Sequence, residues 1–303
     1  MKKTLFLSML VAMTITFFAC NKNNDINDPN NPDTTTQATM VMKDAAVDDV
    51  SDASEYEVDF FTTAVDSLEP AENNPNWHWW HINNNAFGGR FKWGHCPNIT
   101  IVSGPNNGYP KTITLDYGDS TVLNNGRVLS GIIIINMSAP PRTDNATRVI
   151  TFDNFAIDSI NIAGSTTMVF TGDNQTQRIF TVNGQLTYTF ADTISLTRTE
   201  QRQREWVAGL ETQFDPSDDV IEITGFVEGV GSEGITYLKE ITEPLIRHGN
   251  CRFIVQGLVT MSINGEAFGT LDYGDGECDR LATLTINGVS RIIIIGRRKP
   301  GGQ

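Results

Sequence analysis

Lys111-Thr-Ile-Thr-Leu-Asp-Tyr-Gly-Asp119 and Gly269-Thr-Leu-Asp-Tyr-Gly-Asp-Gly276 are two copies of one stretch, and they decide the fold. Each copy leads into a run of four isoleucines, Ile132–Ile135 in the first and Ile292–Ile295 in the second. A cysteine lies 20 residues before the first aspartate of the first copy and 21 residues before that of the second. The sequence therefore predicts a three-strand unit used twice: a cysteine strand, an Asp-Tyr-Gly-Asp strand and an isoleucine strand.

The acidic residues of these copies have two interpretations. Paired carboxylates can bind calcium or perform acid–base chemistry, and Asp272, Asp275 and Asp279 would be the calcium ligands. Asp-Tyr-Gly-Asp is also a turn sequence, in which glycine adopts a positive φ and aspartate bonds to its own backbone. Because both copies continue into an isoleucine strand, we expect the turn, with no metal site and no cofactor.

Residues 96–303 have the composition of antiparallel β-strands. Threonine, isoleucine and valine dominate, and polar and apolar residues often alternate. Asn183-Gly184, Asn264-Gly265 and Asn287-Gly288 are hairpin signals. The isoleucine runs do not alternate, which predicts central strands that are covered on both faces. The predicted fold is all-β, either sandwich-like or a strongly curved sheet, preceded by an amphipathic helix.

Residues 38–68 predict that helix. Apolar residues recur at steps of three and four from Val47 to Leu68, and glycine and proline are absent. The acidic residues between Asp44 and Glu55 are expected to face solvent. Such a helix would pack on a face of the sheet, and binding to a partner protein is the alternative.

The segment from Thr193 to Trp206 predicts one long strand whose two faces can be counted. Arg198, Arg202 and Arg204 fall on the same face, together with Glu200. The strand is expected to be exposed in its middle, where this row would form a cross-strand charge ladder. Binding of an anion is the alternative.

Residues 69–95 form an aromatic-rich loop segment. The sequence predicts an aromatic cluster that plugs one end of the β domain. Alternatives are a metal site built from the local histidines, whose spacing does not match zinc patterns, and a platform for stacking on a sugar ring. The tryptophans of that platform would be Trp77, Trp79, Trp80 and Trp93.

The amino-terminal sequence predicts export and lipid anchoring. Residues 1–19 combine a charged start, an apolar stretch and a small residue before Cys20, as an export signal does. Cys20 is expected to become the lipidated residue, which anchors the chain to a membrane without spanning it. Residues 20–37 are rich in asparagine, aspartate, proline and threonine, and predict a disordered tether. The expected location is the cell envelope, at the periplasmic face or surface of the outer membrane.

The composition restricts the function. A net charge of −14 argues against nucleic acid, whose phosphates repel an acidic chain. The sequence contains no Gly-x-Ser-x-Gly elbow, His-Glu-x-x-His motif, Walker loop or dinucleotide fingerprint. No catalytic residue is predicted, and we favour a protein that is not an enzyme.

Three cysteines remain after Cys20, and exported proteins keep disulfides. Cys251 and Cys278 lie in one copy of the repeat and are expected to form a bridge. Val122 stands where the first copy would need the second cysteine, so Cys96 is expected to be a free thiol. Pairing of Cys96 with either other cysteine is the alternative.

Several motifs occur in order along the chain. They are Cys96-Pro-Asn-Ile-Thr100, Arg204-Glu-Trp-Val-Ala-Gly209, Cys251-Arg-Phe-Ile-Val-Gln-Gly257 and Thr270-Leu-Asp-Tyr-Gly-Asp-Gly276 with Cys278-Asp279. Between about residues 96 and 295 the chain resembles a family of uncharacterised Bacteroidota-type lipoproteins. The resemblance implies a lipid-anchored all-β body after an acidic helix, and it transfers no functional residue.

The predicted function is that of a lipid-anchored envelope protein of unknown activity, a binding or structural scaffold for a glycan or a protein partner. One alternative is a hydrophobic-ligand carrier with the helix as a lid, which requires a deep apolar cavity beneath the helix. A less favoured alternative is a hydrolase, which requires a histidine within about 3 Å of a carboxylate or hydroxyl in a cleft.

Overall fold

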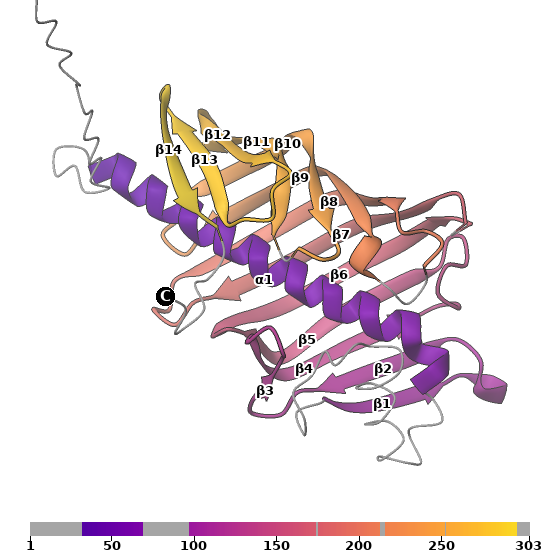
Figure 1. Ribbon diagram of the computed structural model, residues 1–303. Coiled ribbons are helices and arrows are strands. Elements are labelled where there is room, and N and C mark those ends of the chain that lie inside the picture. The colour runs from indigo at the N-terminus through magenta and orange to yellow at the C-terminus, as the bar shows by residue number, and fades with distance from the viewer. Residues whose placement is uncertain (1–31, 69–96, 174, 213–215, 252, 296–303) are drawn as a thin grey trace, which may run out of the picture.

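The computed structural model describes residues 32–68, 97–173, 175–212, 216–251 and 253–295, which form one helix and one antiparallel sheet (Figure 1). The helix is α1 (Pro32–Leu68), and two short 3-10 turns cover Pro105–Asn107 and Pro216–Asp218. The strands are β1 (Asn98–Ser103), β2 (Lys111–Asp116), β3 (Thr121–Val122), β4 (Val128–Met137), β5 (Thr147–Ile157), β6 (Ile160–Gly172), β7 (Arg178–Thr189), β8 (Ser195–Ala208), β9 (Val220–Gly231), β10 (Thr236–His248), β11 (Ile254–Ile263), β12 (Glu266–Asp275), β13 (Leu281–Ile286) and β14 (Val289–Ile294). The prediction of an all-β chain with one preceding helix is confirmed.

The strands follow each other through the sheet in chain order. The path runs β1-β2-β4-β5 and then in sequence to β14, and the two-residue β3 pairs with β4 beside this path. Every described pairing is antiparallel, because short turns join neighbouring strands. The sheet is open, and β1 and β14 are its edges.

The helix lies across one face of the sheet, and the sheet curls around it. In Figure 1, α1 crosses in front of the central strands while β12–β14 bend forward over it. From Lys43 to Thr63, every described side chain of the helix is buried or half-buried. Val47 and Phe61 belong to the same continuous core as Ile133 of β4 and Val259 of β11. Of the two predicted architectures, the strongly curved sheet is therefore correct, and the helix forms its centre.

The repeated Asp-Tyr-Gly-Asp stretch is a turn in both copies. The backbone N–H of Gly118 donates to Asp116 Oδ1 at 2.8 Å, and that of Gly274 donates to Asp272 Oδ1 at 2.9 Å. The two glycines have φ of 60° and 99°, which residues with a Cβ rarely adopt. The turn interpretation of the sequence is confirmed.

The two isoleucine runs have different positions. The first lies in β4 between β2 and β5, with Ile133 and Ile135 fully buried, as predicted for a central strand. The second lies in edge strand β14, where Ile292 and Ile294 are 70% and 63% exposed, so its central placement was wrong. In the second copy the six-residue β13 pairs with β12 and β14 and occupies the place that β4 has beside β2.

The hairpin signals also differ in outcome. Asn264-Gly265 and Asn287-Gly288 form turns with positive φ at all four residues, as predicted. Asn183-Gly184 was wrongly predicted as a turn, because it lies inside β7. A Cβ on Gly184 would come within 2.9 Å of both Thr166 Oγ1 and Glu200 Oε1, so glycine makes room for neighbouring side chains.

The helix begins at Pro32, six residues before the predicted start at residue 38. The predicted tether, residues 20–37, thus overlaps the first helical residues. The predicted export signal at residues 1–19 and the aromatic-rich segment at residues 69–95 lie outside the described residues. In the part of the chain that is described, no helix has the length and hydropathy of a membrane-crossing segment.

Candidate functional site

Strand β8 supplies three of the basic residues that pair with the helix. Its inward face is the one found by counting alternate residues, and Arg198 and Arg204 on it are almost fully buried. Arg198 Nη2 lies 2.6 Å from Asp48 Oδ1, and Arg204 Nη2 lies 2.7 Å from Asp59 Oδ2. Arg202 pairs with Glu55 between them. The ion pairs therefore follow the same order along β8 as along the helix, which crosses this strand obliquely (Figure 1).

Neighbouring strands extend this set of ion pairs to both sides. Lys239 of β10 lies 2.7 Å from Asp44, and Arg148 of β5 lies 3.1 Å from Asp59. Seven acidic residues of the helix face seven basic residues of the sheet and its loops. The acidic residues are Asp44, Asp48, Asp49, Asp52, Glu55, Glu57 and Asp59, and the basic residues are Arg127, Arg148, Arg198, Arg202, Arg204, Lys239 and Arg247.

Two sequence predictions were wrong here for one reason. The acidic residues of the helix were expected to face solvent, and the basic row of β8 was expected to be an exposed cross-strand ladder. Each set is instead the partner of the other in the interior. Charged residues are almost never fully buried unless they are paired, and the periodicity of one element does not show what lies opposite it.

The tyrosines of the repeated turn also reach the helix. The Tyr117 hydroxyl donates to Glu57 Oε2 at 2.7 Å, and the Tyr273 hydroxyl lies 3.5 Å from Asp48 Oδ2. Both side chains are buried. The duplicated unit thus contacts the helix from the two ends of the sheet, a role that the sequence analysis missed.

The ionisation of the helix carboxylates follows from this burial. Removal from water acts to raise the pKa of Asp48, Asp52 and Asp59. For Asp48 and Asp59 the nearby cations outweigh that effect, so the pKa of each is lower than its ordinary value. For Asp52 burial is the larger effect, opposed by Arg247 and Arg202, and its pKa rises to about 6. Asp52 is thus the helix carboxylate that is least well compensated.

The space beneath the middle of the helix is nearly filled. The described cavity beneath the helix, lined by Val58, Phe152, Met168 and Leu186 among others, has a volume of only about 10 Å³. Apolar packing and ion pairs make up the rest of the interface that the structure describes. A hydrophobic-ligand carrier needs a deep apolar cavity at this place, and the described residues do not provide one.

The hydrolase alternative has no support among the described residues. His248 is the one histidine in that part of the chain, and its side chain forms no hydrogen bond or ion pair there. No three histidine, cysteine, aspartate or glutamate residues are grouped to hold a metal in the described ranges. Asp272 and Asp279, two of the calcium candidates, instead accept backbone hydrogen bonds from Gly274 and Leu281.

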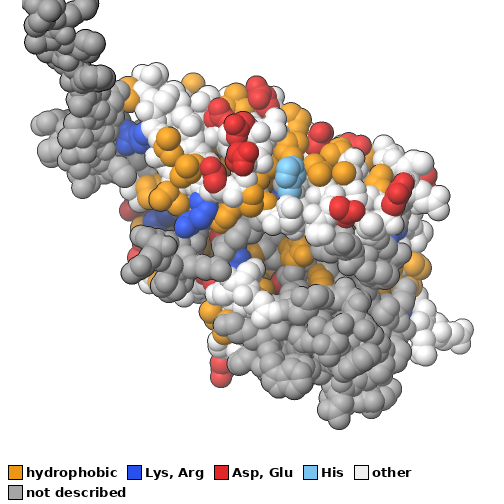
Figure 2. Space-filling view, viewed as in Figure 1, with side chains coloured by type: hydrophobic (Ala, Val, Ile, Leu, Met, Phe, Trp, Pro, Cys, Tyr) orange, Lys and Arg blue, Asp and Glu red, His pale blue; other side chains and the backbone are white. Residues whose placement is uncertain are grey.

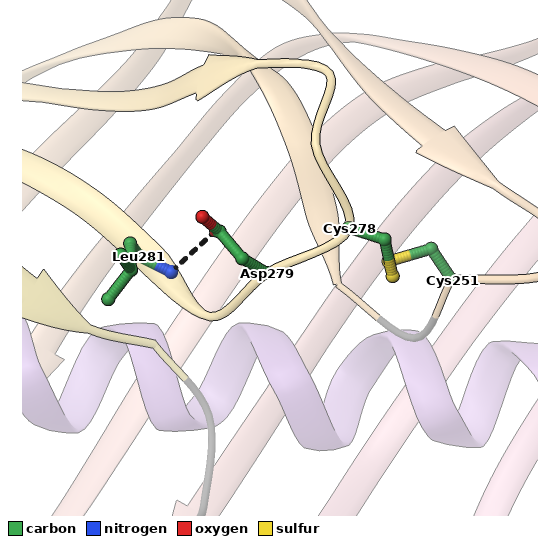
Figure 3. Close-up of a disulfide and its surroundings, with 4 residues drawn as sticks. All are labelled: Cys251, Cys278, Asp279 and Leu281. Atoms are coloured by element: carbon green, nitrogen blue, oxygen red, sulfur yellow. Dashed lines mark hydrogen bonds between the residues drawn. A yellow bond between two sulfur atoms is a disulfide. The ribbon is translucent and has the colours of Figure 1, made fainter.

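The predicted disulfide is present. Cys251 and Cys278 form a bridge with Cα atoms 5.7 Å apart, and it joins the start of the second unit to the turn before β13 (Figure 3). In the same view the Asp279 carboxylate accepts a hydrogen bond from the Leu281 backbone at 2.8 Å. This bridge closes one rim of the helix–sheet interface.

The other predicted site residues lie outside the described residues. They are Cys20, Trp77, Trp79, Trp80, Trp93 and Cys96. Lipidation of Cys20, ligand stacking by the tryptophans and the free thiol of Cys96 therefore stay predictions.

The outer face of the β13–β14 hairpin carries an exposed apolar patch, the edge patch. It consists of Leu281, Ile292 and Ile294, which are 45% to 70% exposed. Figure 2 shows hydrophobic side chains gathered over this hairpin with acidic side chains beside them. No described strand pairs with the outer side of β14, so its backbone hydrogen-bonding groups are open there. The patch combines exposed aliphatic side chains with a free strand edge.

Several bases of the interface were not found from the sequence, although a signal for them existed. Arg148 shares its strand face with Ile150, and Lys239 shares its face with Tyr237. A basic residue that alternates with buried apolar residues on one strand points inward as they do. Counting alternate residues, as for β8, would therefore have placed Arg148 and Lys239 in the interface.

Comparison with protein-family models, with curated proteins and with solved structures finds no match to this chain. The resemblance to Bacteroidota-type lipoproteins therefore stays a prediction from the motifs.

Proposed function

We propose that this chain is a lipid-anchored envelope protein that works as a binding scaffold, and that its edge patch binds a protein partner. The observation that carries the proposal is the free edge of β14 with Ile292 and Ile294 exposed. Folded proteins usually protect such edges with charge, proline or a covering element, because an open edge recruits other strands.

The chemistry of the edge patch favours a protein over a glycan. An added strand would bond to the open backbone of β14, and its alternate side chains would cover the isoleucines. Sugar rings stack on aromatic side chains, whereas this patch is aliphatic. A glycan would need the tryptophans of residues 77–93.

The small space beneath the middle of the helix supports a scaffold over a carrier. Helix and sheet meet through ion pairs and close packing, with about 10 Å³ of space beneath the helix. Binding by this body would therefore take place on its surface. The proposed anchor at Cys20 would hold that surface at a membrane.

Site-specific photo-cross-linking in intact cells tests the partner. A photoreactive residue at Ile292 should give a discrete cross-linked product, and the same residue at Thr199, which is exposed on β8, should not. The product should disappear when Ile294→Lys is added, because a charge on the strand opposes burial of the edge. Equal products from both positions would contradict the proposal.

Cell fractionation tests the anchor. The chain should be recovered with membranes, and Cys20→Ala should move it to the soluble fraction because the lipid cannot be attached. Membrane recovery that is unchanged in the variant would show that Cys20 is not the anchor.

A further inference from the structure

A cleft of about 240 Å³ opens beside the helix, at the end of β10. The helix contributes Asp52 and Tyr56 to its lining, and the sheet contributes Arg247, His248 and Asn250. The disulfide residue Cys251 lies at the rim. The lining thus combines the helix, the end of β10 and the loop that leads to the disulfide.

Arg247 differs from the other six bases that face the helix. Only 7% of the surface of Arg247 is exposed. The other six each form an ion pair, whereas Arg247 forms no hydrogen bond or ion pair with any described residue. Its nearest ring is Tyr56, with the guanidinium carbon 5.9 Å from the ring centroid. The N–H donors of the Arg247 guanidinium are therefore available to a ligand in the cleft.

Asp52 is the matching exception among the helix acids. It is 9% exposed and accepts no hydrogen bond from the described residues. Its closest cation is Arg202 Nη1 at 4.0 Å, a long separation for an ion pair. Burial raises the pKa of Asp52 to about 6, and the attraction of Arg247 and Arg202 offsets only part of this effect. At neutral pH the cleft thus holds one carboxylate and one guanidinium, which attract each other at a distance but form no ion pair.

The remaining charges around the cleft are already occupied. Asp49 pairs with Arg127, and Glu57 accepts the hydrogen bond of Tyr117. A buried charge without a partner is strongly unfavourable. A ligand with one positive and one negative group would supply a close partner of opposite charge to both Asp52 and Arg247.

We propose that this cleft binds a small zwitterion, with its anionic group on Arg247 and its ammonium group on Asp52. A guanidinium can hold a carboxylate or phosphate through two parallel hydrogen bonds. A plain anion would be repelled by Asp52, and a plain cation by Arg247. Drug-sized ligands occupy clefts of about 300 to 1,000 Å³, so this smaller cleft suits a molecule the size of a free amino acid. The inference stands apart from the edge patch and does not rest on the proposed partner.

Thermal shift and calorimetry on the intact chain test the proposal. The probes are a panel of α-amino acids, γ-aminobutyrate and phosphoethanolamine, at about 10 mM, a concentration that saturates a site of millimolar affinity. Propionate and propylamine are the single-charge arms. At least one zwitterion should raise the melting temperature and release or absorb heat, with neither single-charge arm matching it. No response to any member of the panel would overturn the proposal.

Variants locate the binding. Arg247→Gln and Asp52→Asn should each weaken the responding zwitterion about 10- to 100-fold, the range for loss of a hydrogen bond to a charged group. Arg291→Gln, in edge strand β14, is the matched control and should bind as the parent does. If Arg247→Gln fails to fold, Arg247→Lys keeps the charge without the two-pronged donor and should still weaken binding. Binding that survives these changes, or propionate that binds as well as the zwitterion, would refute the assignment.

Discussion

Arg204 shows how single residues hold this molecule together. Its side chain is fully buried, and it lies between Glu55 and Asp59 of the helix at 3.3 and 2.7 Å. Burying ions is costly, and close pairing compensates for that cost. The ion pairs between helix and sheet therefore determine where the helix lies and add little net stability.

Removing one charged residue of these ion pairs should lower the free energy of unfolding by much more than the small net stability that the pairs add. Arg204→Met should lower the free energy of unfolding by about 3 to 5 kcal/mol, because it removes a buried cation from two carboxylates and leaves Asp59 with Arg148 alone and Glu55 with Arg202 alone. Urea denaturation measures the change. Gln203→Met, at the neighbouring exposed position of the same strand, is the control and should stay within about 0.5 kcal/mol of the parent.

Asp52 should have the opposite effect on stability from its neighbour Asp48. The pKa of Asp52 is raised to about 6 in the folded chain, so between the ordinary value of 3.8 and 6 the folded chain binds more protons than the unfolded chain. Its ionisation thus lowers stability as the pH rises through this window. Asp52→Asn should be more stable than the parent at pH 7 and above, by roughly 1 to 3 kcal/mol, and the gain should disappear below pH 4.

Asp48→Asn provides the contrast. Because the folded pKa of Asp48 is lowered, its stabilising contribution is complete above the ordinary value of 3.8 and is lost as the pH falls through the folded value. This variant should be less stable than the parent at pH 7. Chemical denaturation across pH 3 to 8 measures both variants, and equal signs for the two at pH 7 would contradict this account of the interface.

At the scale of elements, the two copies of the repeated unit attach the helix unequally. The bond from Tyr117 to Glu57 is 2.7 Å long, whereas Tyr273 lies 3.5 Å from Asp48, which has closer partners in Lys239 and Arg198. The copies share a turn sequence, but the first supplies the stronger contact.

Matched substitutions in the two copies can reveal this difference. Tyr117→Phe should cost about 1 to 3 kcal/mol in unfolding free energy, because it removes one hydrogen-bond donor from a buried carboxylate. Tyr273→Phe should cost less than about 0.5 kcal/mol, because the contact it removes is at the limit of a hydrogen bond. Thermal and urea unfolding of the two variants provide the test. Equal losses of stability would contradict the expectation that the shorter contact, that of Tyr117, is the stronger one.

At the scale of the whole molecule, helix and sheet form one core. The helix supplies Val47, Val58 and Phe61 to the same apolar cluster as the strands, and its charges pair with strands from β5 to β10. Elements that share a core in this way open together. The helix is therefore a central part of the body and not a lid.

Hydrogen exchange can distinguish a core helix from a lid. Backbone amides of residues 47–61 should exchange as slowly as those of β8, because both open only with global unfolding. Amides of edge strand β14 serve as the comparison and should exchange faster. A helix that exchanges orders of magnitude faster than β8 would indicate a lid that opens by itself.

The sequence alone determined the local structure of this protein. Alternation predicted which residues share a face of β8, Asp-Tyr-Gly-Asp predicted the same turn twice, and the helix, the Asn-Gly turns at 264 and 287 and the Cys251–Cys278 bridge were also predicted. Apart from the bridge, which joins two cysteines of one repeat copy, each of these depends on residues that are neighbours in the chain or share one element, and periodicity and turn chemistry report on such neighbours.

Only the tertiary structure decided which elements lie opposite one another. The acidic helix and the basic row of β8 each look like a solvent-exposed surface when considered alone, and together they are the interior. Likewise, the two isoleucine runs are almost identical in sequence, yet β13 pairs between β12 and β14 and leaves the second run at the edge. The cleft of Asp52 and Arg247 joins residues 195 positions apart. A periodic pattern fixes which side chains share a face, and the pairing of distant elements fixes what that face meets.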